Sequence, residues 1–237
     1  GFELGARNAI GVAIACACAG IIIGVVTLTG VGLKMAHGLI ELAGGNLLLS
    51  LFFAMITSIV LGMGVPTTAT YIITSTLAAP AITMLGVPIL AAHMFVFYFG
   101  IVADITPPVA LAAYAGSGIA KSDPMKTGFV STKLAIGAFL VPYIFVYNPA
   151  MLLINTTPLL LTQNIITAGC GMYGVGAAMI GFCLAPMNWV ERAVFFGAGL
   201  LLIDPGALTD LAGLSILVLC MANQVRKKRA LAAEVAV

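Results

Sequence analysis

Long apolar runs make up most of this chain, and short stretches rich in Gly, Pro, Asn and charged residues separate them. A helix needs about 20 apolar residues to cross the hydrocarbon core of a bilayer. Most of the runs reach or approach that length, so the pattern predicts helices embedded in a membrane. The runs cover residues 8–29, 46–63, 67–86, 88–120, 127–147, 164–186, 190–208 and 207–225. We therefore predict an all-α, polytopic membrane protein.

Residues 30–45 follow a different pattern. Lys34, His37 and Glu41 recur at spacings of three and four, so they share one face of a helix, and apolar residues such as Leu33 can turn to the other. An amphipathic helix of this kind is expected to lie in the membrane interface. The alternative for this segment is a plain polar loop.

Composition supports a membrane protein and excludes several other classes. The chain is 62% hydrophobic and only 8% charged, whereas soluble domains are about 25% charged. Its net charge of +2 provides no field for an anionic polymer, so the lipid bilayer is an expected partner and nucleic acid is not. The sequence holds no paired acids, nucleophile–base pair or metal-ligand cluster at a useful spacing. We therefore expect no enzyme activity, no catalytic residues, no metal centre and no cofactor.

Basic residues predict the orientation of the chain. Four of them stand together at residues 226–229, directly after the last apolar run. Cytoplasmic loops of membrane proteins carry an excess of Lys and Arg. If residues 226–229 are cytoplasmic and the runs cross in turn, the same side also holds Arg7, Lys121, Lys126, Lys133 and Arg192. Lys34 is the exception, and Glu41 on its own helical face is its local partner. We predict a multi-pass protein of a bacterial-type inner (plasma) membrane with a cytoplasmic C-terminus. The count leaves open whether residues 46–86 form two full spans or a re-entrant hairpin.

The first of two helix breaks lies at residues 62–70. Gly62 and Gly64 free the backbone, and Pro66 removes an amide donor and bars an ordinary helix. Hydroxyl groups then stand at the start of the next helix, on Thr67, Thr68 and Thr70. Non-helical backbone at membrane depth is tolerated only where it is buried in protein or lines a cavity. The break is either the tip of a hairpin that binds an ion or substrate, or a kink between two ordinary spans.

The second break contains Asp104, Thr106, Pro107 and Pro108. A continuous helix over its apolar run would be about 48 Å long at 1.5 Å per residue, which exceeds the roughly 30 Å hydrocarbon core. An unwound centre is therefore expected. Asp104 is the only acid between residues 42 and 120, and an acid inside the membrane is by default a functional hypothesis. The alternative is a loop residue between two short spans.

Both breaks offer oxygen atoms at membrane depth. Carbonyl and hydroxyl oxygens suit a hard cation such as sodium, and the positive N-terminal end of a half-helix suits a carboxylate. The candidate sodium ligands are Gly62, Gly64, Thr67, Thr68, Asp104 and Thr106.

The residues of the two breaks also resemble a known family. Residues 62–71 are followed by Gly-Ile-Val-Ala-Asp-Ile-Thr-Pro-Pro-Val-Ala at 100–110 and by Ser-Gly-Ile-Ala at 117–120. Together they resemble the large membrane subunit of tripartite ATP-independent periplasmic (TRAP) transporters. The resemblance covers about residues 45–150, and residues 150–225 look like the C-terminal extension of fused TRAP permeases of the TAXI type.

This resemblance implies a sodium-driven importer of organic acids, dicarboxylate or glutamate-like, that works with a periplasmic substrate-binding protein. It implies an elevator fold with inverted repeats, each with a re-entrant hairpin and a discontinuous helix. Residues 1–150 would be part of the second-repeat transport domain, and residues 151–237 a C-terminal transmembrane extension with a basic cytoplasmic tail. Residues 62–68 would be the hairpin tip and residues 104–108 the unwound centre. Two alternatives are an ion-coupled anion carrier without a binding protein and a non-transporting membrane scaffold.

The sequence departs from the family pattern in two respects. Ala110 stands where the family usually has Gly after Thr-Pro-Pro-Val. The first repeat and the small membrane subunit are missing, and the chain begins at Gly1 rather than Met. We therefore expect a fragment or processed product that needs the N-terminal segments of the permease to transport.

One further motif invites a different interpretation. Residues 169–174 match the GxGxxG pattern of dinucleotide sites, but no strand precedes them and they lie in an apolar run. With Gly176, these glycines are expected to allow close packing of helices.

Overall fold

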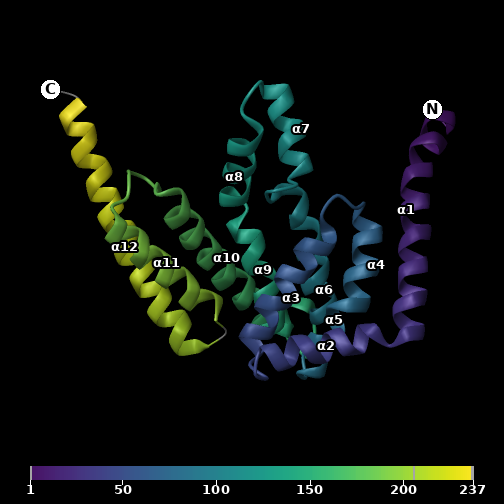
Figure 1. The fold of residues 1–237 in the computed structure, drawn as a ribbon. Helices are drawn as coiled ribbons and strands as arrows, with labels where there is room; N and C mark the ends of the chain where they lie inside the picture. The colour runs from purple at the N-terminus through teal and green to yellow at the C-terminus, as the bar shows by residue number, and fades with distance from the viewer. Residues whose placement is uncertain (1, 205, 236–237) are drawn as a thin grey trace. The chain divides into compact units, whose positions relative to one another are not determined.

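The computed structural model describes residues 2–204 and 206–235, and within them it is helical throughout apart from loops and one isolated bridge between Phe182 and Pro186. The prediction of an all-α chain is confirmed. The α-helices are α1 (Phe2–Thr29), α2 (Val31–Leu42), α3 (Leu47–Gly62), α4 (Thr67–Leu77), α5 (Ala79–Met84), α6 (Ile89–Val102), α7 (Leu111–Ala120), α8 (Pro124–Leu134), α9 (Ile136–Tyr147), α10 (Pro158–Ile180), α11 (Trp189–Ile203) and α12 (Ala207–Val235). Two 3-10 turns are η1 (Ala103–Ile105) and η2 (Pro149–Leu152) (Figure 1).

Several of these helices are suited to a membrane. Among the described residues, the segments Pro124–Tyr147 and Leu208–Arg229 are long and apolar enough to cross one, and Cys16–Thr29 with Val31–Leu42 would add a third span although they are bent by 76°. Shorter apolar helices cover Leu47–Gly62, Ile89–Ile105 and Leu111–Ala120. These features support a polytopic membrane protein.

The chain divides into two compact units, Gly1–Thr132 and Lys133–Val237, which are described separately. This division rests on contacts within the chain. The functional division at residue 150, expected from the sequence, stays a prediction.

In the first unit, α1 and α2 meet at a corner. Gly30 has a φ of +66°, a left-handed conformation that favours glycine, and the chain turns there. The segment 30–45 is thus a helix rather than a polar loop, with Lys34, His37 and Glu41 exposed as expected. Leu33 is 60% exposed. Gly32 and Ala36 form the buried face instead, because small residues let α2 approach its neighbours.

The hairpin at residues 46–86 has two short arms. The 16 residues of α3 rise about 24 Å, and the 11 residues of α4 about 17 Å. Neither helix reaches the roughly 30 Å of a hydrocarbon core, which favours a re-entrant hairpin over two full spans. The second arm, residues 67–86, is not one continuous helix. It divides at Ala78, because Pro80 lacks an amide hydrogen and can stand only in the first turn of a new helix, α5.

The core of the first unit lies where α3, α4, α5 and α6 pack together. Its fully buried side chains include Leu51, Ile82, Phe95 and Phe99, and the rings of the two phenylalanines lie 4.8 Å apart in an edge-to-face arrangement. This packing fixes the hairpin against α6, so the positions of the two breaks depend on the same core.

The second unit is built on α10, α11 and α12, which pack side by side (Figure 1). Glycine makes this packing close, because a Cβ atom at Gly171 would lie 2.7 Å from the carbonyl oxygen of Gly199. Gly174 is also packed, against the backbone of α11 and a side chain of α12. The expected role of residues 169–176 in helix packing therefore holds for these two glycines, while Gly169 and Gly176 face open space.

Helix ends in the second unit differ from the predicted runs. The run predicted at 164–186 is α10, which begins at Pro158 because the Thr157 hydroxyl caps it by accepting from the N–H of Leu160, and which ends at Gly181 with a φ of +81°. The last run was predicted to end at residue 225. The helix continues instead through the basic residues to Val235, because Arg, Lys and Ala favour helix.

Candidate functional site

The first break is a short non-helical turn between α3 and α4. Gly64 has a φ of +72°, Pro66 is extended, and α4 begins at Thr67. The Thr70 hydroxyl donates to the Val65 carbonyl at 3.1 Å, which ties the turn to the first turn of α4. The side chains of Thr67 and Thr68 are exposed. The hairpin tip therefore presents two exposed hydroxyl groups at a helix N-terminus.

The second break separates α6 from α7. After the 3-10 turn η1, Thr106 is extended, and Ala110 takes a left-handed conformation with a φ of 38° before α7 begins. A cis peptide bond joins Pro107 to Pro108. The predicted unwound centre is thus present in the structure. Glycine would fit the left-handed backbone at residue 110 without strain, which gives a physical reason for the glycine usual at this place in the family.

Within this break, Asp104 and Thr106 differ in their surroundings. The Thr106 hydroxyl donates to the Val102 carbonyl at 2.7 Å and so satisfies the last turn of α6. Asp104 is partly exposed and makes no ion pair or hydrogen bond with any described residue. A carboxylate placed between two half-helices without a protein partner is available to a cation.

The two breaks lie against each other in the first unit. A Cβ atom at Gly62 would stand 3.0 Å from the Cα of Gly100, and one at Gly100 would stand 2.6 Å from Cγ2 of Thr70. Gly62 ends α3, Thr70 lies in the first turn of α4, and Gly100 precedes the second break by less than two turns. The structure therefore brings the predicted hairpin tip against α6, about one helical turn before the second break. Gly62 acts here through its lack of a side chain.

Several residues that support the second break were not expected from the sequence. The Thr132 hydroxyl of α8 donates to the Ile105 carbonyl at 3.1 Å, and the Tyr114 hydroxyl of α7 donates to the Pro108 carbonyl at 2.8 Å. Gly128 of α8 packs on the break, since its Cβ would lie 3.1 Å from Cγ of Pro107. These contacts hold the non-helical backbone and satisfy two of its carbonyls. The aromatic and hydroxyl residues that follow the break are a weak signal of this role.

A second polar contact joins the hairpin to α6. The Tyr71 hydroxyl lies 3.0 Å from Nδ1 of His93, and the Tyr71 ring meets the Phe97 ring edge-on at 5.5 Å. Both contacts join side chains of neighbouring helices and have the character of packing. It links the second arm of the hairpin to the first half of the discontinuous helix, so the two elements are held as one body.

Hydroxyl, carbonyl and single carboxylate groups are what this region offers chemically. Within residues 2–204 and 206–235, no three His, Cys, Asp or Glu side chains come together as a metal cluster. Oxygen ligands of this kind suit a hard cation with weak binding, rather than a transition metal.

Two interrupted, apolar helical segments set against each other within an all-helical chain are typical of multi-pass membrane transporters. The family model described as "Tripartite ATP-independent periplasmic transporter, DctM component" matches residues 2–160, about two-thirds of the chain. The chain therefore belongs to this family of transporter components, as the resemblance of residues 45–150 predicted. The match includes both breaks and residues 2–132 of the first unit. No curated protein and no solved structure matches the chain.

Proposed function

We propose that this chain is a membrane permease component of a sodium-coupled, binding-protein-dependent TRAP importer of organic acids, dicarboxylate or glutamate-like, of the TAXI type. The observation that carries the proposal is the close approach of Gly62 and Thr70 to Gly100. It places the hairpin tip against α6 about one helical turn before Asp104, a carboxylate without a partner among the described residues, in a transporter family. The membrane is the bacterial inner membrane, with the C-terminus in the cytoplasm.

In this proposal, sodium binds to oxygen atoms from both breaks. The carbonyls of Gly62 and Gly64 and the hydroxyls of Thr67 and Thr68 serve from the hairpin. Asp104 and Thr106 serve from the discontinuous helix. The negative charge of Asp104 makes the site favourable for a cation, and an ion bound by both breaks would be held by the body that the hairpin and α6 form together.

The substrate carboxylate binds at the N-terminal end of α4. The first N–H groups of this helix lack intrahelical partners, and the helix dipole favours a negative charge there. Pro66 precedes the helix and Thr67 is its first residue, so the position of this N-terminal end is fixed by the sequence. Sodium nearby compensates the charge of the anion, which gives a physical reason for coupled transport.

The partners of this component are a periplasmic substrate-binding protein, the remaining N-terminal permease segments and the lipid bilayer. A soluble binding protein captures the acid and delivers it to the permease. If uptake requires this binding protein, the chain is part of a TRAP importer and not of an anion carrier that works alone. Uptake by the membrane components without the binding protein would support an anion carrier that works alone.

The test is sodium-dependent uptake by the complete transport system, reconstituted with its binding protein. The double variant Asp104→Ala/Thr106→Ala is expected to abolish uptake, because it removes the carboxylate and a hydroxyl of the same break. Asp123→Ala/Thr127→Ala is a matched control, since it removes the same two groups at the start of α8, where Asp123 precedes the helix and Thr127 lies in its first turn. Full uptake by the first double variant would overturn the assignment of these residues.

A further inference from the structure

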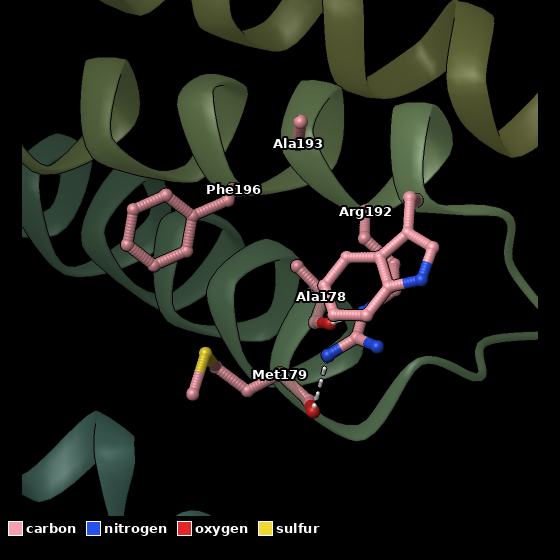
Figure 2. A pocket seen from close by; sticks show the side chains of 6 residues that line it. Ala178, Met179, Arg192, Ala193 and Phe196 are labelled. Carbon is pink, nitrogen blue, oxygen red and sulfur yellow. Dashed lines mark hydrogen bonds between the residues drawn. The ribbon is translucent and has the colours of Figure 1, made fainter.

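One end of the second unit carries an apolar hollow of about 310 Å³. It lies between the last turn of α10 and the first turns of α11, and its lining residues are Ala178, Met179, Trp189, Arg192, Ala193 and Phe196. Figure 2 shows the hollow, with the ring of Phe196 and the side chain of Met179 on one side and the Arg192 guanidinium on the other. The hollow therefore has an apolar floor and a cationic edge.

Arg192 is held in place by the end of α10. Its Nε donates to the Ala178 carbonyl at 2.7 Å and an Nη donates to the Met179 carbonyl at 3.1 Å (Figure 2). The Trp189 ring lies over the guanidinium at 4.5 Å. A guanidinium has five N–H donors, and these two bonds leave three of them without an acceptor among the described residues. No described carboxylate pairs with Arg192.

The nearest acid in the sequence, Glu191, is already occupied. Its carboxylate accepts from Lys227 at 3.0 Å and also from Asn223, Gln224 and the N–H of Asn188. These bonds place the start of α11 beside the basic end of α12. Arg226, Lys228 and Arg229 are exposed on the same end of the unit. This end of the second unit is therefore positively charged, and among the described residues Glu191 is the one carboxylate that pairs with a basic residue there.

The surroundings of the hollow are those of a membrane interface. Two large apolar side chains are exposed beside the hollow: Trp189 is 80% exposed and Val190 is 74% exposed. Exposed tryptophan and arginine are enriched at the headgroup level of membranes. An occupant that matches an apolar floor, a cationic edge and an exposed indole has an acyl chain and a phosphate.

We propose that this hollow is a binding site for an anionic phospholipid. The phosphate accepts hydrogen bonds from the free N–H groups of Arg192, while the indole of Trp189 covers the guanidinium. One acyl chain lies along Met179, Ala193 and Phe196. The basic residues 226–229 add a general attraction for anionic lipid at the same end of the unit. The bound lipid would act as a fixed part of the C-terminal unit.

The test uses Trp189, the only tryptophan of the chain. The chain is reconstituted in phosphatidylcholine bilayers that contain a minor fraction of lipid with brominated acyl chains, either phosphatidylglycerol or phosphatidylcholine. Bromine quenches the indole on contact. Brominated phosphatidylglycerol is expected to quench at an about fivefold lower fraction than brominated phosphatidylcholine, the factor that corresponds to one basic residue at an anionic surface. Equal quenching by the two lipids would overturn the proposal.

Two variants separate a built site from general attraction. Arg192→Gln is expected to lose most of the preference for phosphatidylglycerol, whereas Lys228→Gln, which removes an equal charge outside the hollow, keeps most of it. An equal loss in both variants would show a diffuse field and overturn the site. Because Arg192 also caps α10, Ala193→Phe provides an independent measurement. It fills the hollow without removing charge, and an unchanged preference in this variant would contradict the proposal.

Discussion

Gly62 of α3 and Gly100 of α6 approach so closely that a Cβ atom at Gly62 would stand 3.0 Å from the Cα of Gly100. The contact joins the hairpin tip to the helix that leads into the second break. Gly100 is confined from the other side by Cγ2 of Thr70. Three residues from three helices thus set the spacing between the two breaks, and this spacing can be changed one methyl group at a time.

Gly100→Ala is expected to destabilise the protein by about 1–3 kcal/mol, the usual cost of forcing an extra methyl group into a packed core. It is also expected to lower sodium-dependent uptake. Thermal unfolding in detergent and uptake by the complete system are the two measurements. Gly116→Ala is the control, because a Cβ there meets nothing within 4 Å.

Thr70→Ser should partly rescue Gly100→Ala. The serine lacks Cγ2, which is the atom the new methyl group would meet at 2.6 Å, and it keeps the hydroxyl that donates to the Val65 carbonyl. The double variant is therefore expected to unfold at a higher temperature than Gly100→Ala alone. Additive destabilisation by the two substitutions would show that this contact does not set the spacing.

Thr132→Val removes the hydroxyl that α8 directs at the Ile105 carbonyl, 3.1 Å away, and at the Gly128 carbonyl of its own helix, 3.0 Å away, and it keeps the shape of the side chain. A carbonyl of the second break then loses its partner, at a cost of about 1–3 kcal/mol. We expect reduced uptake together with a lower unfolding temperature. Thr127→Val is matched to it, because that hydroxyl bonds only at the start of α8. Equal uptake by the two variants would rule out support of the break by Thr132.

Gly171→Ala is expected to loosen α10 from α11 in the second unit, because its Cβ would meet the Gly199 carbonyl oxygen at 2.7 Å. Gly169→Ala is expected to be neutral or to stabilise by up to about 1 kcal/mol, since alanine favours helix and nothing lies within 4 Å. The unfolding temperature of each variant is the measurement: Gly171→Ala reports the cost of disturbed packing, and Gly169→Ala reports the gain in helix propensity. A similar change in both would contradict close packing at Gly171.

The sequence allowed much of the fold to be predicted, because local features determine it. The apolar runs set the helices, and Gly64 with Pro66 broke one of them where the structure has a turn. The limits of α10 and α12 were misjudged because capping by Thr157 and the helix preference of basic residues outweighed the end of the apolar pattern. Where a helix ends depends on helix propensity and capping as well as on the hydrophobic pattern.

The partners of each break were not predictable in the same way. Thr132 lies 27 residues from the Ile105 carbonyl that it satisfies, and Gly62 lies even farther from Gly100 in the sequence. A periodic pattern identifies the buried face of a helix but not which helix meets it. Gly100 was part of the motif that resembled the family, yet its role as a contact followed only from the folded arrangement.

The sodium dependence of uptake by Asp104→Asn tests the central claim most directly. Asparagine keeps the shape and one oxygen of the side chain but removes its charge. If Asp104 binds the coupling ion, the sodium concentration for half-maximal uptake should rise about tenfold or more, as expected for losing an interaction with a charged group. Asp123→Asn, at the start of α8, should leave it unchanged. An unchanged sodium requirement in Asp104→Asn would contradict a sodium site between the two breaks.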